Sequence, residues 1–314
     1  MKLIIQIPCL NEDGTLATTI AALPKTVAGI DIVELLVIDD GSTDATAEVA
    51  RACGVHHIVR NKRNLGLATS FRRGLDAALA AGADIIVNTD GDNQYSGADV
   101  GALIAPILAG EADIVIGDRQ TRGLQQFSAL KKLLQWLGSG VVQRLASAQV
   151  PDTVCGFRAL SRDAALRLNI VSEFSYTTEM IIQAGKKRLA MTAVPIHTNR
   201  VERKSRLFQS IPQFVARTLS TMIRTYAMYK PLRVLFFVGV LLTLIGIVPV
   251  VRFLYFYALG DGGGHIQSLV IGGAFLVMGF VTFLGGLLAD LIAVNRKLLE
   301  DLLERVRRAE LDRR

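Results

Sequence analysis

The octapeptide Asn88-Thr-Asp-Gly-Asp-Asn-Gln-Tyr95 follows a short run rich in β-branched residues, Asp84-Ile-Ile-Val87. The run predicts a strand, and the polar residues after it mark where that strand ends. Two carboxylates, Asp90 and Asp92, stand one residue apart there, and the carboxamide of Gln94 follows. Like charges repel, and apolar surroundings disfavour an unpaired carboxylate, so we expect a positively charged partner at this strand end.

Strands and helices alternate on both sides of this stretch. Apolar runs predict strands at residues 3–7, 34–38, 57–59, 84–88 and 113–116, and helical segments at 16–23, 45–53, 66–81 and 100–109. This alternation predicts an α/β fold with a mostly parallel sheet, in which ligands bind at the carboxyl ends of the strands. Acidic segments follow three of these strands, at residues 8–12, 39–42 and 90–92, so one shared site is expected.

The sequence lacks the motifs that mark several common ligand-binding sites. No GxGxxG turn follows the first strand and no GxxxxGK[ST] occurs, so dinucleotide and P-loop sites lose their main support. An EF-hand beginning at Asp90 would need Gly where Tyr95 stands and Glu where Gly101 stands. A nucleoside diphosphate bound with a divalent ion remains. Carboxylate and carboxamide oxygens suit Mg²⁺ or Mn²⁺, and a diphosphate supplies further oxygens.

The composition favours anionic partners and a reducing compartment. Lys and Arg number 35 against 28 acidic residues, a net charge of +7 that suits phosphates or a lipid surface. The three cysteines, Cys9, Cys53 and Cys155, lie far apart without CxxC spacing. This spacing predicts free thiols, with neither a disulfide framework nor a zinc site.

Two apolar runs, 234–251 and 269–289, each approach the ~20 residues that a helix needs to cross a bilayer. A helical hairpin buried in a large core is the alternative. Basic residues flank the pair on its outer ends (Arg224, Lys230, Arg233, Arg296 and Lys297), whereas the connector at 260–265 has no Lys or Arg. The positive-inside rule therefore predicts a two-span membrane protein whose two ends are cytoplasmic and whose connector faces the other side.

Six short motifs occur in an order that resembles family 2 glycosyltransferases with the GT-A fold. They are IPCLNE (7–12), VIDDGSTD (37–44), NLG (64–66), DGDNQ (90–94), GDR (117–119) and CGFR (155–158). Within that family the chain looks like the polyprenyl-phosphate glycosyltransferases, similar to dolichol-phosphate mannose synthases, over roughly residues 3–207. It departs from the family pattern at Cys9-Leu10, Gly91 and Cys155.

The resemblance assigns residues to the donor half of the site. It implies that Asp92 and Gln94 bind Mg²⁺ or Mn²⁺, with Asp90 facing the ribose, the sugar or a metal-bound water. It also implies a nucleotide-sugar site formed by a further set: Pro8, Asn11, Glu12, Asp39 and Asp40. A simpler interpretation of residues 39–44 is a helix cap, in which Ser42 or Thr43 caps a helix beginning near Asp44.

A lipid phosphate acceptor changes what the acceptor half must provide. A phosphate monoester has a second pKa near ~6, so it needs a cationic clamp more than a general base. The resemblance implies acceptor or diphosphate contacts for Arg119, Arg200, Ser205 and Arg206, and a looser one for Lys132. The candidates also include Arg158. Asp152 matches an acid assigned as the base in some members, and it could instead orient Arg158.

The expected organisation is a GT-A catalytic domain (1–204), amphipathic interfacial helices (205–231), two transmembrane helices (232–294) and a cytoplasmic C-terminal helix (295–314). Leucines at 298, 299, 302 and 303 could support a short homo-oligomer contact. The expected function is inverting transfer of a hexose from a nucleotide-sugar to undecaprenyl or dolichyl phosphate, with no nucleic-acid partner. The alternatives are a family 2 enzyme with another lipid or glycan acceptor, and a non-catalytic membrane scaffold.

Overall fold

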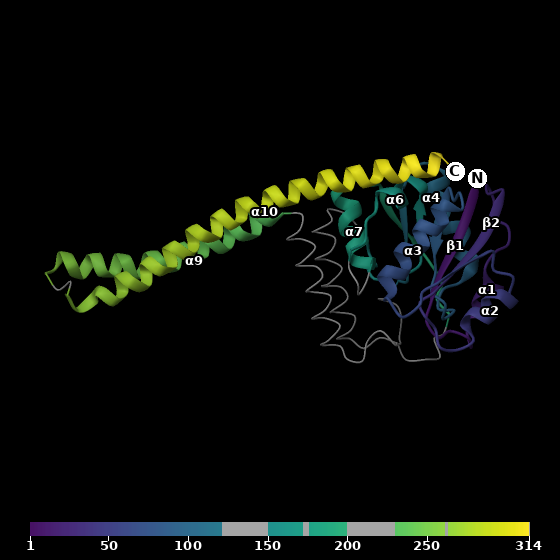
Figure 1. Ribbon diagram of the computed structural model, residues 1–314, viewed down its shortest axis with the longest axis horizontal. Helices are drawn as coiled ribbons and strands as arrows, with labels where there is room; N and C mark the ends of the chain where they lie inside the picture. Colours follow the sequence, from purple (N-terminus) through teal and green to yellow (C-terminus); the bar gives the residue numbers. More distant parts are fainter. Residues whose placement is uncertain (121–149, 172–175, 200–229, 261–262, 314) are drawn as a thin grey trace. The chain divides into compact units, whose positions relative to one another are not determined.

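The computed structural model describes residues 1–120, 150–171, 176–199, 230–260 and 263–313 (Figure 1). The chain divides into two compact units. One comprises Met1–Met222 together with Leu303–Arg314, and the other comprises Ile223–Leu302. The predicted interfacial helices at 205–231 lie almost wholly outside the described residues.

The first unit is built on a seven-stranded sheet of order β3-β2-β1-β4-β6-β5-β7. The strands are β1 (Lys2–Cys9), β2 (Ile32–Asp39), β3 (His57–Arg60), β4 (Ile85–Asn88), β5 (Ile114–Asp118), β6 (Arg158–Ser161) and β7 (Met191–Pro195). All neighbouring pairs are parallel except those of β6, which runs antiparallel between β4 and β5. This confirms the predicted α/β class with a mostly parallel sheet.

The helices of this unit follow the strands in the predicted alternation. They are α1 (Leu16–Ala22), α2 (Thr46–Ala52), α3 (Leu67–Ala80), α4 (Val100–Leu108), α6 (Arg162–Arg167) and α7 (Tyr176–Lys186), with a 3-10 turn η1 (Gly97–Asp99). Helix α3 buries Phe71, Leu75 and Ala78 at helical spacing and packs on β1 and β2. The predicted elements match the first five strands and first four helices to within two residues. Strands β6 and β7 and helices α6 and α7 were not predicted from the sequence.

The strand order decides where a ligand can enter. From β1 the chain continues to β2 on one side of it, and later returns to β4 on its other side. In such a sheet the connections leave β1 and β4 in opposite directions, which opens a crevice at their carboxyl ends. The acidic segments found in the sequence follow these same strands.

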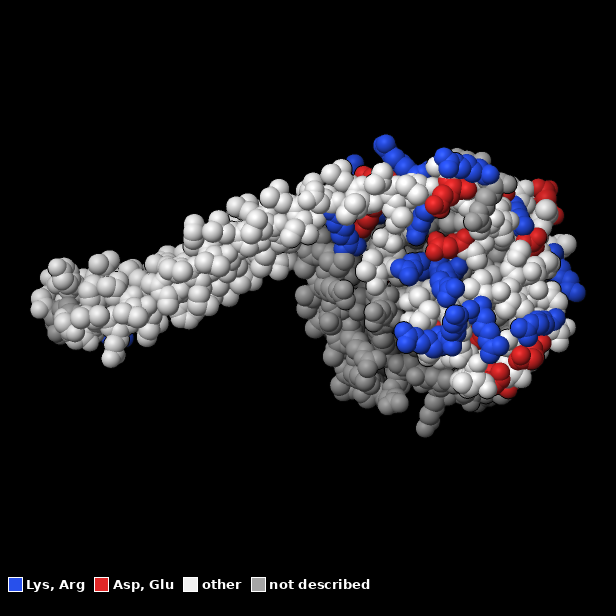
Figure 2. Space-filling model, in the orientation of Figure 1, with Lys and Arg blue, Asp and Glu red and all other residues white. Residues whose placement is uncertain are grey.

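The second unit contains α9 (Pro231–Ala258), the short turn η2 (Gly263–His265) and most of α10 (Ile266–Asp312). Both α9 and α10 are long and apolar enough to cross a membrane, with mean hydropathies of 2.9 and 2.1 in their most apolar windows. Figure 2 shows almost no charged side chains along this helical pair on the face in view. The second expected span and the expected C-terminal helix form one continuous helix, α10, with no break at residue 294.

Glycines bring α9 and α10 into close contact. A Cβ atom at Gly246 would lie 2.9 Å from the carbonyl oxygen of Gly272, and one at Gly239 would lie 3.3 Å from that of Gly279. Seven residues separate the two glycines in each helix, so small residues recur along one face. Close backbone approach through small residues is how helices associate in lipid, where no hydrophobic force favours their contact.

We expect Gly246→Val to separate this helix pair. The new side chain would meet the α10 backbone, and overpacking of this kind costs about 1–3 kcal/mol. Gly273→Val is the matched control, because no atom lies within 4 Å of its added Cβ. Unfolding in SDS, followed by helical circular dichroism, should begin at a lower SDS fraction for Gly246→Val alone. Equal shifts for both variants would contradict the glycine contact.

Candidate active site

The three acidic segments meet at one edge of the sheet. The register pairs Cys9 of β1 with Asp39 of β2, and Gln6 of β1 with Asn88 of β4. Because these strands are parallel, the residues that follow each of them emerge on the same side. The strand ends in the sequence predict this arrangement.

Asp39 is fully buried at the end of β2. Its Oδ1 accepts a hydrogen bond from the Ser42 backbone N–H at 2.8 Å, and its Oδ2 lies 3.0 Å from Nε of Arg60. Arg60 ends β3 and is half-exposed, so the pair has one buried and one solvated member. Arg60 was not among the predicted site residues, although a cation at the end of the neighbouring predicted strand was the signal for it.

Asp40 holds the loop that precedes α3. Its Oδ1 accepts from Nδ2 of Asn61 at 2.7 Å and from the Leu65 N–H at 2.9 Å, while Oδ2 accepts from the Gly66 N–H at 2.9 Å. Hydrogen bonds to a carboxylate are among the stronger ones in proteins. Both oxygens of Asp40 therefore fix the Asn64-Leu65-Gly66 turn, in addition to the nucleotide contact that the resemblance implies.

Asn11 joins the loop after β1 to the loop after β2. Its N–H donates to Oγ of Ser42 at 2.9 Å, and its Oδ1 accepts from the Thr43 N–H at 2.9 Å. The predicted cap at Ser42 or Thr43 is therefore wrong. Helix α2 begins at Thr46, whose N–H donates to Oδ1 of Asp44 at 3.0 Å, because Ser42 and Thr43 are engaged by Asn11 instead.

Glu12 and its neighbours fix the middle of the acidic motif. The Thr15 hydroxyl contacts Oε2 of Glu12 and the Gly91 carbonyl oxygen, both at 2.9 Å, and the Thr19 hydroxyl donates to that carbonyl at 3.1 Å. A Cβ on Gly91 would lie 2.9 Å from Sγ of Cys9. Two of the departures from the family pattern are therefore neighbours in space, and the thiol occupies the room that a larger residue at 91 would need.

Asp90 lies in surroundings that oppose its charge. A Cβ on Gly156 would come within 2.8 Å of its Oδ2, so the carboxylate packs directly on that backbone. Burial raises the pKa of Asp90 to about 7, and repulsion from Asp92 adds to the increase. Arg119 and a hydrogen bond from Tyr95 act in the opposite direction. The Tyr95 hydroxyl also accepts from the Gly156 N–H at 3.1 Å, which fixes both groups.

The donor atoms here fit a divalent cation whose coordination is completed by a ligand. Asp92 and Gln94 supply hard oxygens of the kind that Mg²⁺ and Mn²⁺ prefer, beside the buried carboxylate of Asp90. Oδ1 of Asn93 is buried without a hydrogen-bond partner among the described residues. Within those residues no group of three His, Cys, Asp or Glu side chains is placed to hold a metal ion. A bound diphosphate would have to supply the remaining oxygens.

The segment after β7 is tied to this acidic loop. The N–H of Asn199 donates to the Gln94 carbonyl at 2.8 Å, and its Nδ2 donates to the Asn93 carbonyl at 3.0 Å. Tyr95 and Thr198 form an isolated antiparallel bridge beside these bonds. No local pattern in the sequence predicts this pairing, which joins residues about a hundred positions apart.

Arg119 and Asp152 form a two-pronged ion pair. Nε of Arg119 donates to Oδ2 of Asp152 at 2.6 Å, and an Nη donates to Oδ1 at 3.0 Å. The Arg119 side chain is 12% exposed and that of Asp152 is 2% exposed, so a small part of the arginine reaches the surface while the carboxylate is buried. Of the two roles considered for Asp152, this geometry favours a positioning carboxylate, but the residue that it orients is Arg119.

Arg158 has a different position from the one that an acceptor contact requires. It is fully buried in β6, and its guanidinium donates to the carbonyl oxygens of Cys155 at 2.7 Å, Thr177 at 2.8 Å and Thr153 at 2.8 Å. The guanidinium also lies 5.8 Å from the ring centroid of Tyr176. A side chain without exposed surface cannot touch a bound phosphate, so the structure argues against this predicted role. Arg158 instead holds the backbone that carries Gly156.

Four predicted acceptor residues lie outside the described part of the chain: Lys132, Arg200, Ser205 and Arg206. Their roles stay predictions. Pro8 is buried within β1, next to Cys9 and the Asn11 turn.

Comparison with known proteins agrees with this geometry. The chain is 30% identical over 193 residues to the glycosyltransferase AglJ of Haloferax volcanii, covering 60% of each protein. It is 27% identical over 186 residues to a dolichyl-phosphate hexose transferase of the same organism, covering 59% of this chain and 78% of the relative.

A solved structure shares the fold. Glucosyl-3-phosphoglycerate synthase of Mycobacterium tuberculosis, crystallised with Mn²⁺, UDP and its product, superposes with a TM-score of 0.53 at 24% identity. The match covers 72% of this chain and 78% of that one.

The model of the glycosyl transferase family 2 matches residues 4–168, more than half of the chain. The resemblance to family 2 glycosyltransferases and the GT-A fold expected from the motifs are thereby confirmed, and the chain belongs to glycosyl transferase family 2.

Proposed function

We propose that this glycosyltransferase moves a hexose from a nucleotide-sugar to a polyprenyl phosphate at the cytosolic face of a membrane. The observation that carries the proposal is the meeting of Asp39, the Asp90–Asp92 motif and Arg119 near one edge of the sheet. This edge offers carboxylates for a nucleoside and a cation, and a guanidinium for an anion. Similarity to a dolichyl-phosphate hexose transferase supports a polyprenyl phosphate as the acceptor.

In the donor half, Asp92 and Gln94 would hold Mg²⁺ or Mn²⁺ together with the diphosphate, and Asp90 would lie beside them. The bound ion supplies charge neutralisation for the departing diphosphate. The solved relative was crystallised with Mn²⁺ and UDP, which supports this assignment. Asp39, fixed by Arg60 and the Ser42 N–H, would meet the nucleoside, with Pro8, Asn11 and Glu12 beside it.

In the acceptor half, the phosphate oxygen attacks the anomeric carbon as the bond from that carbon to the diphosphate oxygen breaks. The configuration at the carbon inverts because attack and departure lie on opposite faces. The acceptor phosphate is already ionised near neutral pH, so no side chain needs to remove a proton. Arg119, held by Asp152, would reduce the repulsion between the incoming phosphate and the anionic donor.

Two other functions make different demands on the site. A family 2 enzyme acting on another lipid or on a glycan needs a general base for a hydroxyl nucleophile. A non-catalytic scaffold needs neither the acidic loop nor the buried Arg119–Asp152 pair.

A donor and acceptor panel tests the proposal. Membranes containing the protein are incubated with radiolabelled UDP- and GDP-sugars, with and without added polyprenyl phosphate, and the labelled lipid is extracted. We expect one sugar to enter a lipid that releases it in mild acid, only when polyprenyl phosphate and Mg²⁺ or Mn²⁺ are present. Label entering lipid equally without polyprenyl phosphate would overturn the acceptor assignment.

The proposed orientation has its own test. We expect a cysteine at Gly263, in the turn between α9 and α10, to react with an impermeant maleimide added outside intact cells. A cysteine at Lys297 should react only after the cells are opened, because the basic flanks favour the cytoplasm. The reverse pattern would contradict cytosolic access to the nucleotide-sugar.

A further inference from the structure

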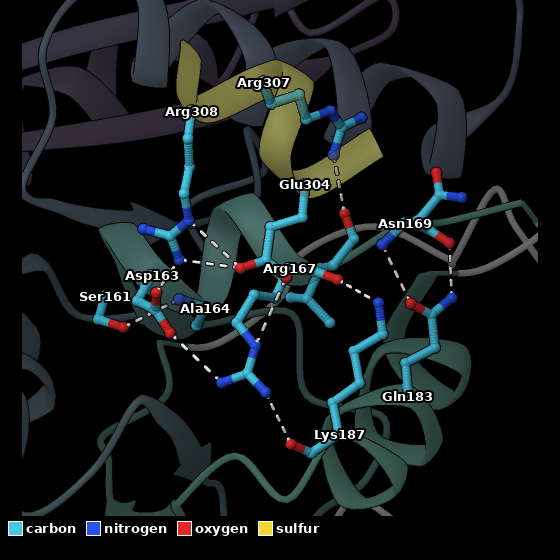
Figure 3. Close-up of polar contacts among 11 residues, drawn as sticks. Ser161, Asp163, Ala164, Arg167, Asn169, Gln183, Lys187, Glu304, Arg307 and Arg308 are labelled. Carbon is cyan, nitrogen blue, oxygen red and sulfur yellow. Dashed lines mark hydrogen bonds and ion pairs between the residues drawn. The ribbon is translucent and has the colours of Figure 1, made fainter. Parts of the chain in front are cut away.

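The last turns of α10 are fastened to the sheet-bearing unit by one face (Figure 3). Arg308 forms an ion pair with Asp163 of α6 and a second one with Glu304, at 3.0 Å, on its own helix. Arg307 donates to the carbonyl oxygen of Leu168 at 3.1 Å. Within this unit the contacts hold the last turns of α10 by the face that carries Glu304, Arg307 and Arg308.

The uncovered face carries apolar residues at coiled-coil spacing. Intervals of alternately three and four residues join a set that we call the heptad seam: Ile292, Asn295, Leu299, Leu302, Val306 and Ala309. Its large apolar members are exposed by 68% at Ile292, 65% at Leu299, 57% at Leu302 and 45% at Val306. Glu304, Arg307 and Arg308 occupy the heptad positions on the other side of the helix, facing the contacts above.

Lipid cannot cover most of this seam. Helix α10 has 47 residues and is therefore about 70 Å long, whereas a bilayer with its head groups measures about 40–45 Å. Leu299 lies about 50 Å along the helix from Ile266, and at a tilt of ~20° this still corresponds to about 47 Å of depth. Leu302 and Val306 lie further on. An apolar seam projecting into water indicates a protein partner.

We infer that the heptad seam of α10 is a homodimer interface, at which it pairs in parallel with the same seam of a second copy of this chain. This inference rests on the proposed membrane anchoring, because two copies inserted with one orientation present their α10 helices side by side and in the same direction. The seam then places each of its residues opposite its own counterpart.

The chemistry of the seam fits a second copy. In a parallel coiled coil, the residue just before an a position of one helix faces the residue just after the following d position of the partner. In the heptad seam, Val306 is an a position and Ala309 is the d position that follows it. Here the exposed Arg305 would face the exposed Glu310 of the other copy, twice per dimer. Asn295 would meet its counterpart, and the two carboxamides could hydrogen-bond to each other. Confinement to a membrane raises the effective concentration, so a short seam suffices.

Disulfide formation in membranes tests the interface. In a background carrying Cys53→Ser, which leaves the buried Cys9 and Cys155, single variants Leu302→Cys and Asp301→Cys are treated with copper phenanthroline. A disulfide needs Cα atoms about 4.4–6.8 Å apart, which paired core positions satisfy. We expect at least tenfold more cross-linked dimer from Leu302→Cys than from the exposed, off-seam Asp301→Cys. Equal yields, or none at Leu302→Cys, would overturn the inference.

Two further measurements identify the reason for a negative result. A seam covered by lipid would give no disulfide at Leu302→Cys and would protect that thiol from a water-soluble maleimide. The mass of the detergent-solubilised protein should halve for Leu299→Glu and stay unchanged for Asp301→Lys. Sugar transfer is measured on the same membranes, so dimers without transfer would refute the proposed function alone, and transfer without dimers would refute this inference alone.

Discussion

Replacing Asp92 with asparagine is expected to lower sugar transfer by about a thousandfold or more. The substitution keeps the shape of the side chain but removes one of the charges that would hold the divalent ion and the donor diphosphate. A metal ion contributes several kcal/mol to stabilising a departing diphosphate, and each 1.36 kcal/mol corresponds to a factor of ten. Transfer is measured over a range of Mn²⁺ concentrations, together with binding of the nucleotide-sugar.

The fold should survive this change, because Asp92 is only partly buried and its described hydrogen bond is to the Gln94 N–H of its own loop. The matched control is Glu111→Gln, which neutralises an exposed carboxylate after α4, far along the chain from the acidic loop. That variant should keep its transfer rate and its Mn²⁺ dependence. Wild-type turnover by Asp92→Asn in EDTA-treated membranes would remove the metal assignment.

Replacing Arg119 with alanine is expected to lower both stability and transfer. The change leaves Asp152 buried without its ion-pair partner, which costs about 3–5 kcal/mol of unfolding free energy. Loss of a charge-assisted contact to an acceptor phosphate would lower transfer by roughly ten- to a hundredfold at about 1.5–3 kcal/mol. Denaturant unfolding and initial transfer rates, measured on the same preparation, check the two effects.

A double variant separates the two effects. Arg119→Ala combined with Asp152→Asn also removes the carboxylate charge that Arg119 compensates, so much of the lost stability should return while transfer stays low. Arg119→Lys should recover little transfer, since an ammonium group cannot reproduce the two-pronged contact with Asp152. Recovery of transfer in the double variant would show that Arg119 serves the fold alone. Slow hydrolysis of the donor by water should persist if Arg119 contacts only the acceptor.

Strands β1 to β5 could be predicted from the sequence because buried parallel strands leave a clear pattern in it. Strands such as β1 are buried on both faces and therefore appear as uninterrupted apolar runs, and their parallel pairing requires the helices between them. Strand β6 escaped detection because Arg158 opens it. Nothing local to that residue shows that three backbone carbonyl oxygens will satisfy a buried guanidinium.

The candidate active site likewise has a part that the sequence predicts and a part that it does not. The acidic loop was recognised because its residues are adjacent in the chain, and Asp39 because a strand leads into it. The pairing of Arg119 with Asp152 joins residues 33 positions apart, and the bond from Asn199 to Gln94 spans a still longer separation. Spacing along the chain carries no information about such contacts, so the motif alone left the role of Asp152 open between two alternatives.

The hydrogen bonds that surround the acidic loop also bear on how tightly a donor can bind. The Gly91 carbonyl is held by Thr15 and Thr19, and the Gln94 carbonyl by Asn199. Conformational freedom that most loops lose when a ligand arrives has here already been lost during folding. Less of the interaction energy is then consumed in ordering the protein, so a weakly held sugar-nucleotide can retain useful affinity. Substitutions of Thr15 and Thr19 that remove their hydrogen bonds to the Gly91 carbonyl should therefore weaken donor binding, because the loop would then lose conformational entropy when the donor binds. Neither substitution removes a group that touches the donor.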